Sequence, residues 1–182
     1  VGPDVKKGRS DSLVSSIDFS ATILELAGEK IPETVQGVSM VPILKEPTAT
    51  IRDVAFAERN WHVYQAHERM VRTGDWLYIR NSWPEKHNVS GESSVPLFPA
   101  AKELWEMAEK GKLSPAQELL TIVPQPEEMI FNTKDDPFQL VDLAGYEENR
   151  SVLQEMRSLL GDWIESTGDS VPSTPRPNRQ PL

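Results

Sequence analysis

Residues 70–80 read Met-Val-Arg-Thr-Gly-Asp-Trp-Leu-Tyr-Ile-Arg. Two segments rich in β-branched and aromatic residues flank the pair Gly74-Asp75, and a two-residue connection that starts with glycine is typical of a β-hairpin. The sequence therefore predicts two antiparallel strands, over 70–73 and 76–80, joined by a tight turn.

Other segments extend this hairpin toward both ends of the chain. Residues 54–58, 130–132 and 138–141 read as further strands, the last two on either side of a turn at 134–137. A helix is predicted from about 147 to 165, because its apolar residues recur at the helical period and fall on one face. These residues are Val152, Met156, Leu159 and Trp163. The predicted fold is α+β, with the helix covering one face of an antiparallel sheet.

The N-terminal segment has a different pattern. Residues 13–17 read as a short buried strand, and Asp18 and Ser20 offer capping oxygens to a helix over 21–27. Gly28 suits the left-handed position that follows a helix. A strand that leads directly into a helix is half of a βαβ unit, which needs a parallel partner strand. This segment is therefore expected to be an incomplete piece of an α/β layer.

The centre and the end of the chain carry weaker signals. Residues 82–99 are rich in proline and serine and are expected to be irregular, whereas 100–110 suits a short helix. Ser114 and Gln117 have the spacing of a capping box at the start of another helix. Residues 167–182 contain four prolines and almost no apolar side chains, so this tail is predicted to be disordered.

Composition excludes several classes of function. The 182 residues carry a net charge of −9 and contain no cysteine. The charge argues against a general nucleic-acid partner, so any anionic ligand needs local positive charge. The missing cysteines exclude disulfides, thiolate metal sites and a cysteine nucleophile. No run of 18 apolar residues exists, so no membrane-spanning helix is expected. Because the first residue is Val1 and not methionine, we expect the chain to be part of a longer protein.

Three segments together resemble the sulfatases, within the alkaline-phosphatase-like superfamily. The first, from 13 to 40, has a strand, an aspartate, a helix ending in Leu-Ala-Gly, and then Gln-Gly-Val-Ser-Met. The second is the hairpin with its flanks, 69–81. The third, 129–144, contains the Asp-Asp-Pro turn and ends in Asp-Leu-Ala. Their order is that of the family, and a finer similarity to sulfamidase (heparan N-sulfatase) is indicated by residues 58–62.

The resemblance implies a division of the chain and a function. Residues 1–46 would be the end of the family's catalytic α/β domain, 50–166 its C-terminal subdomain with a four-stranded antiparallel sheet and a packed helix, and 167–182 a disordered tail. The implied function is part of a sulfuric ester hydrolase that acts on a sulfated carbohydrate. The implied partners are that substrate and the upstream catalytic domain, and the implied location is periplasmic or secreted.

The family's reacting groups are expected to lie outside this stretch. Sulfatases use a formylglycine, made from Cys or Ser in a C/S-x-P-x-R signature, and a calcium ion held by Asp and Asn oxygens. Residues 170–174 imitate the signature, but Thr174 stands where arginine is required. Asp135 and Asp136 are explained by a tight turn. No catalytic and no metal-binding residue is therefore expected here, and the calcium is implied only for the longer protein.

Substrate-binding candidates lie between the first two strands of the predicted sheet. Asn60, His62 and His67 are predicted to contact the sugar, because such loops often carry binding residues. The alternative is that they are polar loop residues with local hydrogen bonds. Arg72 and Arg80 on the hairpin suit either an ion pair with an acidic neighbour or a bound sulfate.

Two other interpretations remain open from the sequence. The chain is alternatively a non-catalytic sulfatase remnant that binds a glycan or a protein. The parent is alternatively a phosphatase or phosphodiesterase of the same superfamily, although the turn around Asp136-Pro137 favours a sulfatase.

Overall fold

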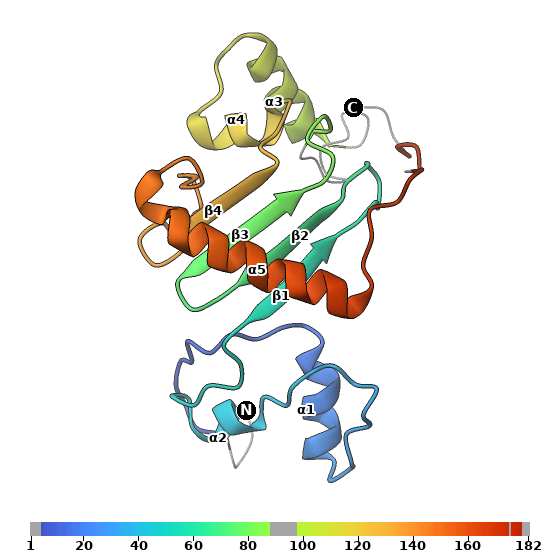
Figure 1. Cartoon of the computed structure of the whole chain (residues 1–182), viewed down its shortest axis with the longest axis vertical. Coiled ribbons are helices and arrows are strands. Elements are labelled where there is room, and N and C mark those ends of the chain that lie inside the picture. Colours follow the sequence, from blue (N-terminus) through green and yellow to red (C-terminus); the bar gives the residue numbers. More distant parts are fainter. Residues whose placement is uncertain (1–4, 88–97, 175, 180–182) are drawn as a thin grey trace. The chain divides into compact units, whose positions relative to one another are not determined.

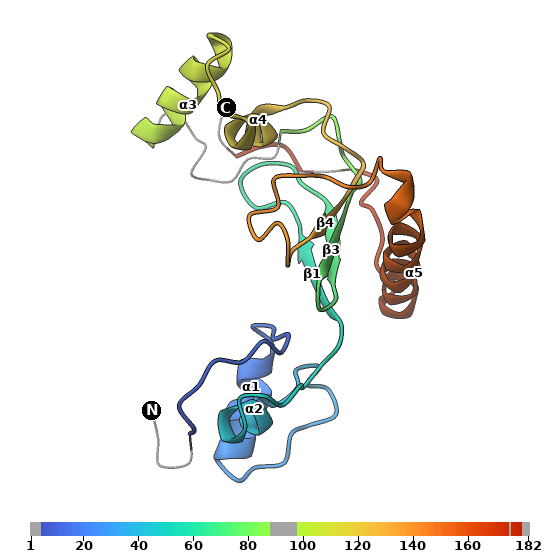
Figure 2. The same cartoon turned by 90° about the vertical axis from the view of Figure 1, so that its left-hand side faces the viewer.

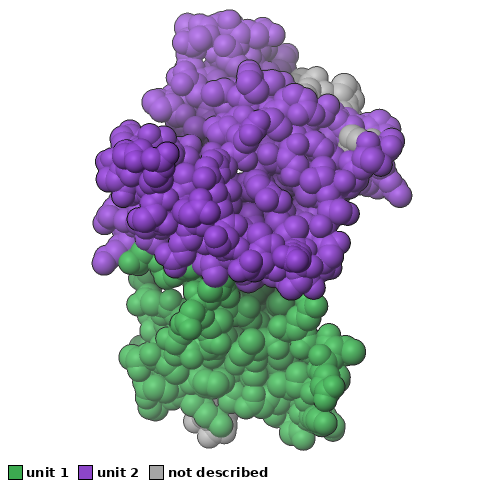
Figure 3. Space-filling model, in the orientation of Figure 1, with its two compact units in different colours: residues 1–55, 72–75 green, residues 56–71, 76–182 purple. Residues whose placement is uncertain are grey.

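The computed structural model describes residues 5–87, 98–174 and 176–179. The chain divides into two compact units, shown in separate colours in Figure 3. Unit 1 comprises residues 1–55 and 72–75, and unit 2 comprises 56–71 and 76–182.

Unit 1 contains the helices α1 (Asp18–Leu26) and α2 (Val41–Lys45). Asp18 is fully buried and ties the segment together, because its two carboxylate oxygens accept hydrogen bonds from the backbone N–H of Ser15 (2.7 Å) and of Val38 (2.8 Å). The guanidinium of Arg52 also pairs with Asp18. Removal of one partner of a buried ion pair is costly, because the other charge is left without compensation. Asp18 therefore joins the start of α1 to the chain beyond it.

The strand predicted over residues 13–17 is wrong. Residues 5–54, all of which are described, contain two helices and no strand, and Val14 and Ile17 are half exposed. A strand needs a hydrogen-bonded neighbour, and in its place the backbone N–H of Ser15 bonds to the side chain of Asp18. The helix begins at Asp18 and not at residue 21, so Asp18 is inside its first turn.

Unit 2 is built on a four-stranded antiparallel sheet in the order β1-β2-β3-β4 (Figure 1). The strands are β1 (Ala55–Arg59), β2 (Glu68–Arg72), β3 (Trp76–Asn81) and β4 (Glu128–Asn132). The order confirms the predicted antiparallel sheet and the hairpin of β2 and β3. The hairpin loop, residues 73–75, is one residue longer than predicted. In the β3–β4 pair Tyr78 lies opposite Ile130, and both are buried.

Helix α5 (Arg150–Thr167) covers one face of this sheet, as Figures 1 and 2 show, and the short 3-10 helix η2 (Glu147–Asn149) precedes it. Its buried side chains follow the helical period, and each contributes about 1.5–3 kcal/mol by burial. They are Leu153, Met156 and Leu160. The helix ends where Gly168 takes a left-handed φ of 66°, a conformation that glycine adopts without strain.

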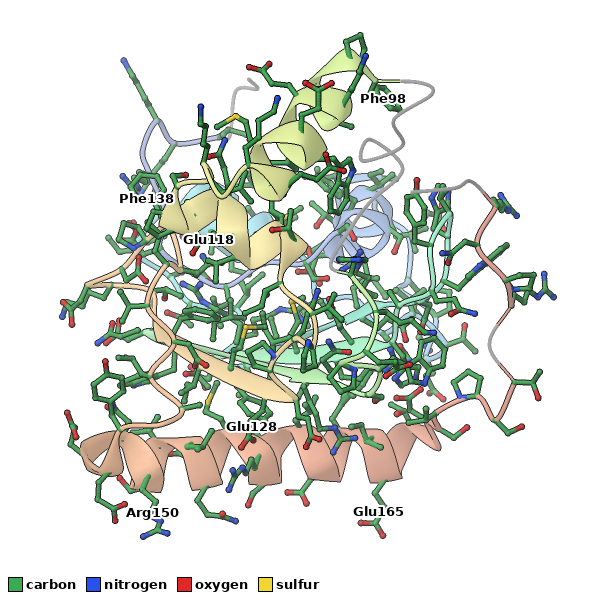
Figure 4. All side chains as sticks on the ribbon, turned by 90° about the horizontal axis from the view of Figure 1, so that it is seen from above. Phe98, Glu118, Glu128, Phe138, Arg150 and Glu165 are labelled. Atoms are coloured by element: carbon green, nitrogen blue, oxygen red, sulfur yellow. The ribbon has the colours of Figure 1, made fainter. Side chains whose placement is uncertain are left out.

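A polar cluster strengthens the contact between α5 and the sheet. Arg157 of α5 donates through Nε to Glu128 of β4 (2.8 Å), and the hydroxyl of Tyr78 donates to the same carboxylate (2.9 Å). Burial and then this hydrogen bond raise the pKa of Tyr78 to about 12. Figure 4 shows Glu128 on the sheet side of α5, whereas Arg150 and Glu165 point away from the sheet.

Helices α3 (Pro99–Glu109) and α4 (Pro115–Thr121) lie at one end of the sheet (Figure 1). The predicted capping box at Ser114 and Gln117 is confirmed. The predicted irregular segment 82–99 is described only at 82–87 and 98–99, and the rest of it lies outside the described residues. No helix among the described residues is long and apolar enough to cross a membrane.

The strand predicted over residues 138–141 is also wrong. Asp136 Oδ2 accepts hydrogen bonds from the backbone N–H of Leu140 (2.6 Å) and Val141 (2.9 Å), which occupies the groups that a strand would use. Gln139 has a φ of 55°, in the left-handed region. Phe138 projects from this loop and is 81% exposed (Figure 4).

Candidate functional site

The candidate site is the loop that joins β1 to β2, residues 60–67, together with the chain that follows α5. The three side chains predicted to bind substrate all lie in or beside this loop, but their environments differ. Asn60 and His62 are exposed, whereas His67 is only 2% exposed. Asn60 and His62 are therefore open to a ligand, and His67 has a different role.

A buried arginine organises the site. Arg69 of β2 is 3% exposed and forms a two-point ion pair with Asp169: Nε donates to Oδ2 (2.6 Å) and Nη2 to Oδ1 (2.8 Å). Its Nη1 donates to Asn60 Oδ1 (3.0 Å). Such fork-shaped pairs of guanidinium and carboxylate fix geometry as well as charge. Arg69 therefore holds Asn60 in place and joins the sheet to the residues after α5.

His67 supports this arginine from the other side. Its Nε2 lies 3.0 Å from Arg69 Nη2, and its Nδ1 lies 3.0 Å from Ser82 Oγ. A guanidinium can only donate, so Nε2 accepts and the proton is on Nδ1, facing the serine hydroxyl. Burial and then the charge of Arg69 hold the pKa of His67 below its ordinary value of 6.5. His67 is therefore a neutral positioning residue for Arg69, and the ring of Trp83 packs beside it at 5.6 Å.

The tail after α5 contacts the same loop. Four hydrogen bonds of 2.8–3.0 Å join residues 176–179 to residues 61–65. Two of them involve Gln65, whose backbone N–H and side-chain amide both donate to the tail. The pairing of Asp169 with Arg69 brings the tail to this position (Figure 1). The prediction of a disordered tail rests on its polar composition, which does not reveal these specific partners.

The solvent face of the site combines an aromatic ring with positive charge. The guanidinium carbons of Arg176 and Arg179 lie 5.6 Å and 4.5 Å from the centre of the Trp61 ring, at distances typical of cation–π contacts. Trp61 Nε1 donates to the carbonyl of Pro177 (3.0 Å), which fixes the ring. This arrangement suits the binding of an anionic ligand.

The described residues do not fit a calcium site. No cluster of three or more His, Asp or Glu side chains with metal-binding geometry occurs in 5–87, 98–174 or 176–179. The two neighbouring acids of the Asp-Asp-Pro turn are used within that turn: Asp135 accepts from the Asn132 side chain (2.7 Å), and Asp136 accepts from two backbone N–H groups. Neither carboxylate is arranged to share a cation with the other.

A cavity elsewhere in unit 2 is too apolar and too negative to bind an anion. A cavity of about 360 Å³ is lined mainly by apolar side chains of β3, β4, α4 and the loop around Phe138. Among its described lining residues Asp142 is the one charged side chain, and it is negative. The loop between β1 and β2 is therefore the better candidate for a sulfated ligand.

The sequence predicts a binding loop at residues 60–67, but it does not point to Arg69, Asp169 or the tail. Arg69 and Asp169 are 100 residues apart, and no local spacing connects them. The usable signal was weaker: the two arginines near the end of an acidic chain, at 176 and 179.

Comparison with known proteins gives a consistent result. The family model described as N-sulphoglucosamine sulphohydrolase, C-terminal, matches residues 3–82. An ulvan-active sulfatase of Formosa agariphila is 32% identical over 162 residues, which cover 87% of this chain and 26% of that protein. Human arylsulfatase K is 29% identical over 90 residues, covering 45% of this chain and 17% of that protein. The chain thus spans about a quarter of the first relative's length.

Solved structures show the same fold. A putative sulfatase from Bacteroides thetaiotaomicron has a TM-score of 0.62 at 20% identity and covers 92% of this chain and 29% of its own. A 2-O GAG sulfatase also has a TM-score of 0.62 at 20% identity, over 100% of this chain and 34% of its own. Similarity at this level of identity speaks for the fold alone. Together with the sequence matches, it shows that the chain is similar to the C-terminal portion of sulfatases.

Proposed function

We propose that this chain is the substrate-facing C-terminal part of a sulfatase that acts on a sulfated carbohydrate. The alignment with the ulvan-active sulfatase carries the proposal, because it extends over 87% of the chain and so includes both units. The exposed Asn60 and His62 and the neighbouring positive charge support a role in holding the substrate.

The proposal places the reacting groups in another part of the protein. The chain has no cysteine, and residues 170–174, which imitate the nucleophile signature, have Thr174 in the position of the arginine. They lie in the exposed tail after α5, whereas a nucleophile needs charge-stabilising donors placed beside it. The calcium ion of the family would likewise be bound by residues of the longer protein, because the described residues do not fit it.

The proposed neighbour of unit 1 is the catalytic domain of the same protein. Three large apolar side chains on α1 are exposed at the spacing i, i+4, i+7, which places them on one face of the helix. They are Phe19 (59% exposed), Ile23 (64%) and Leu26 (65%). An exposed apolar stripe of this kind marks a surface that another element covers, and residues 3–82 match the family's C-terminal region.

The experiment is sulfate release by the protein encoded by the full gene. We expect the upstream sequence to contain a C/S-x-P-x-R signature and a cluster of Asp and Asn ligands. We expect that protein to release sulfate from sulfated oligosaccharides, and its Cys-to-Ala or Ser-to-Ala variant at the signature to release none. The panel should include O-sulfated and N-sulfated sugars. Absence of the signature, or of any hydrolysis from a folded protein, would contradict the enzyme proposal and favour a non-catalytic binding module.

A further inference from the structure

We propose that Trp61, Arg176 and Arg179 form a subsite that binds a sulfate group of the saccharide. The proposal rests on the proposed function, since it specifies how the same surface recognises its ligand. It assigns a role to the tail, whose arginines are held at the loop between β1 and β2.

The geometry of the two arginines leaves their donors available. A cation–π contact engages none of the five N–H donors of a guanidinium in a hydrogen bond. Arg176 and Arg179 both contact the ring of Trp61, and both residues are exposed. Their N–H edges are therefore free to form the paired hydrogen bonds that guanidinium groups make with oxyanions.

The charge of the two arginines is not compensated. In the part of the chain that the structure describes, neither Arg176 nor Arg179 forms an ion pair with a carboxylate. Two exposed arginines elsewhere are paired with carboxylates: Arg150 with Glu147 at 2.7 Å, and Arg157 with Glu128. In a chain of net charge −9, two unpaired guanidinium groups on one ring make a local positive site. Such a site is the requirement for binding a sulfated ligand.

The site is also organised in advance. The tail backbone is held by hydrogen bonds from Trp61 Nε1 to Pro177 O (3.0 Å), from Gln65 Nε2 to Arg176 O (2.8 Å), and from Arg179 N to Val63 O (2.8 Å). Fixing a binding segment before the ligand arrives reduces the ordering cost of association. The tail thus presents its arginines in one arrangement.

The test is calorimetric titration of the 182-residue chain with a heparin-derived tetrasaccharide. Its fully desulfated counterpart and inorganic sulfate are titrated in parallel. The test variant is Arg176→Gln with Arg179→Gln. The matched control is Arg9→Gln with Arg150→Gln, which makes the same change in net charge at two exposed arginines that lie near carboxylates elsewhere. Circular dichroism checks that both variants are folded.

We expect the test variant to bind the sulfated tetrasaccharide at least about tenfold more weakly, the loss expected for one to two charge-assisted hydrogen bonds. The control should bind like the wild-type chain. Arg176→Lys with Arg179→Lys should lie between the two, because it keeps the charge and loses the fork geometry. The proposal would be overturned if the test variant and the control lost the same affinity for the tetrasaccharide, or if the wild-type chain bound the desulfated sugar as tightly as the sulfated one. It would also be overturned if the chain bound inorganic sulfate but not the tetrasaccharide.

A failure here is distinguishable from a failure of the proposed function. The wild-type protein encoded by the full gene is given a small aryl sulfate, and sulfate release is measured. This measures the enzyme function with a substrate that has no saccharide for the tail to bind. Release with unchanged tetrasaccharide binding by the test variant overturns the subsite and leaves the sulfatase proposal standing. Arginine-dependent binding with no release supports the subsite and overturns the enzyme proposal.

Discussion

The ion pair of Arg69 with Asp169 is the contact on which the arrangement of the site depends, and Asp169→Asn tests it. The substitution keeps the size of the side chain and removes its charge. Breaking a buried ion pair costs about 3–5 kcal/mol, because one charge is left without a partner. Asp169 is 18% exposed, and Glu58 lies 3.7 Å from Arg69 and offers partial compensation. We therefore expect a loss of about 2–3 kcal/mol in the free energy of unfolding of unit 2.

Urea unfolding and limited trypsin digestion measure the two consequences of this change. With a urea dependence of about 2 kcal/mol per molar, the midpoint should fall by about 1 M. Trypsin should cleave after Arg179 faster than in the wild-type chain, because the tail is no longer held; Arg176 is followed by proline and resists trypsin in both chains. Asp162→Asn, at an exposed position of α5, is the matched control. If both variants have the same midpoint and the same cleavage rate, the pair does not hold the tail.

Three further predictions concern other charged and buried groups. The stability of unit 2 should fall as the pH drops below about 6.5. The His67 imidazole becomes protonated at this pH in the unfolded chain, whereas its lowered pKa keeps it neutral in the folded protein. Urea midpoints at several pH values measure this decline, which should be smaller in His67→Gln. Asp18→Asn should destabilise unit 1 by about 3 kcal/mol, because it leaves Arg52 without its buried partner. Amide hydrogen exchange in α1 should become faster, and an unchanged exchange rate would contradict this role of Asp18. Glu128→Gln should lower the pKa of Tyr78 from about 12 but not as far as 10, since burial remains the larger cause of the shift. Phenolate absorbance during a pH titration measures this pKa, and an unchanged value would exclude the Glu128 carboxylate as a cause.

Much of unit 2 could be predicted because its signals are local. The hairpin of β2 and β3, the capping box at Ser114 and the apolar period of α5 each depend on residues a few positions apart. The two strand predictions were wrong for a common reason: a run of four or five apolar residues does not indicate whether a neighbouring strand is present to pair with it. At 13–17 and 138–141 a nearby aspartate binds the backbone N–H groups instead.

The candidate site was predicted only in its location. The polar residues 60–67 between two strands predict a binding loop, and Asn60 and His62 are exposed there. That His67 is buried against Arg69 is a consequence of the sheet and of Trp83, which no spacing reveals. The contact of the tail with the sheet joins residues 100 positions apart, and composition alone does not reveal it.

The central claim is that this chain recognises a sulfated sugar while the reacting groups lie elsewhere in the same protein. Its most direct test is to give one sulfated oligosaccharide to the 182-residue chain and to the protein of the full gene, and to measure bound sugar and free sulfate in each. We expect the chain alone to bind without releasing sulfate, and the full protein to release it. Sulfate release by the chain alone, or no binding by the folded chain, would contradict the account.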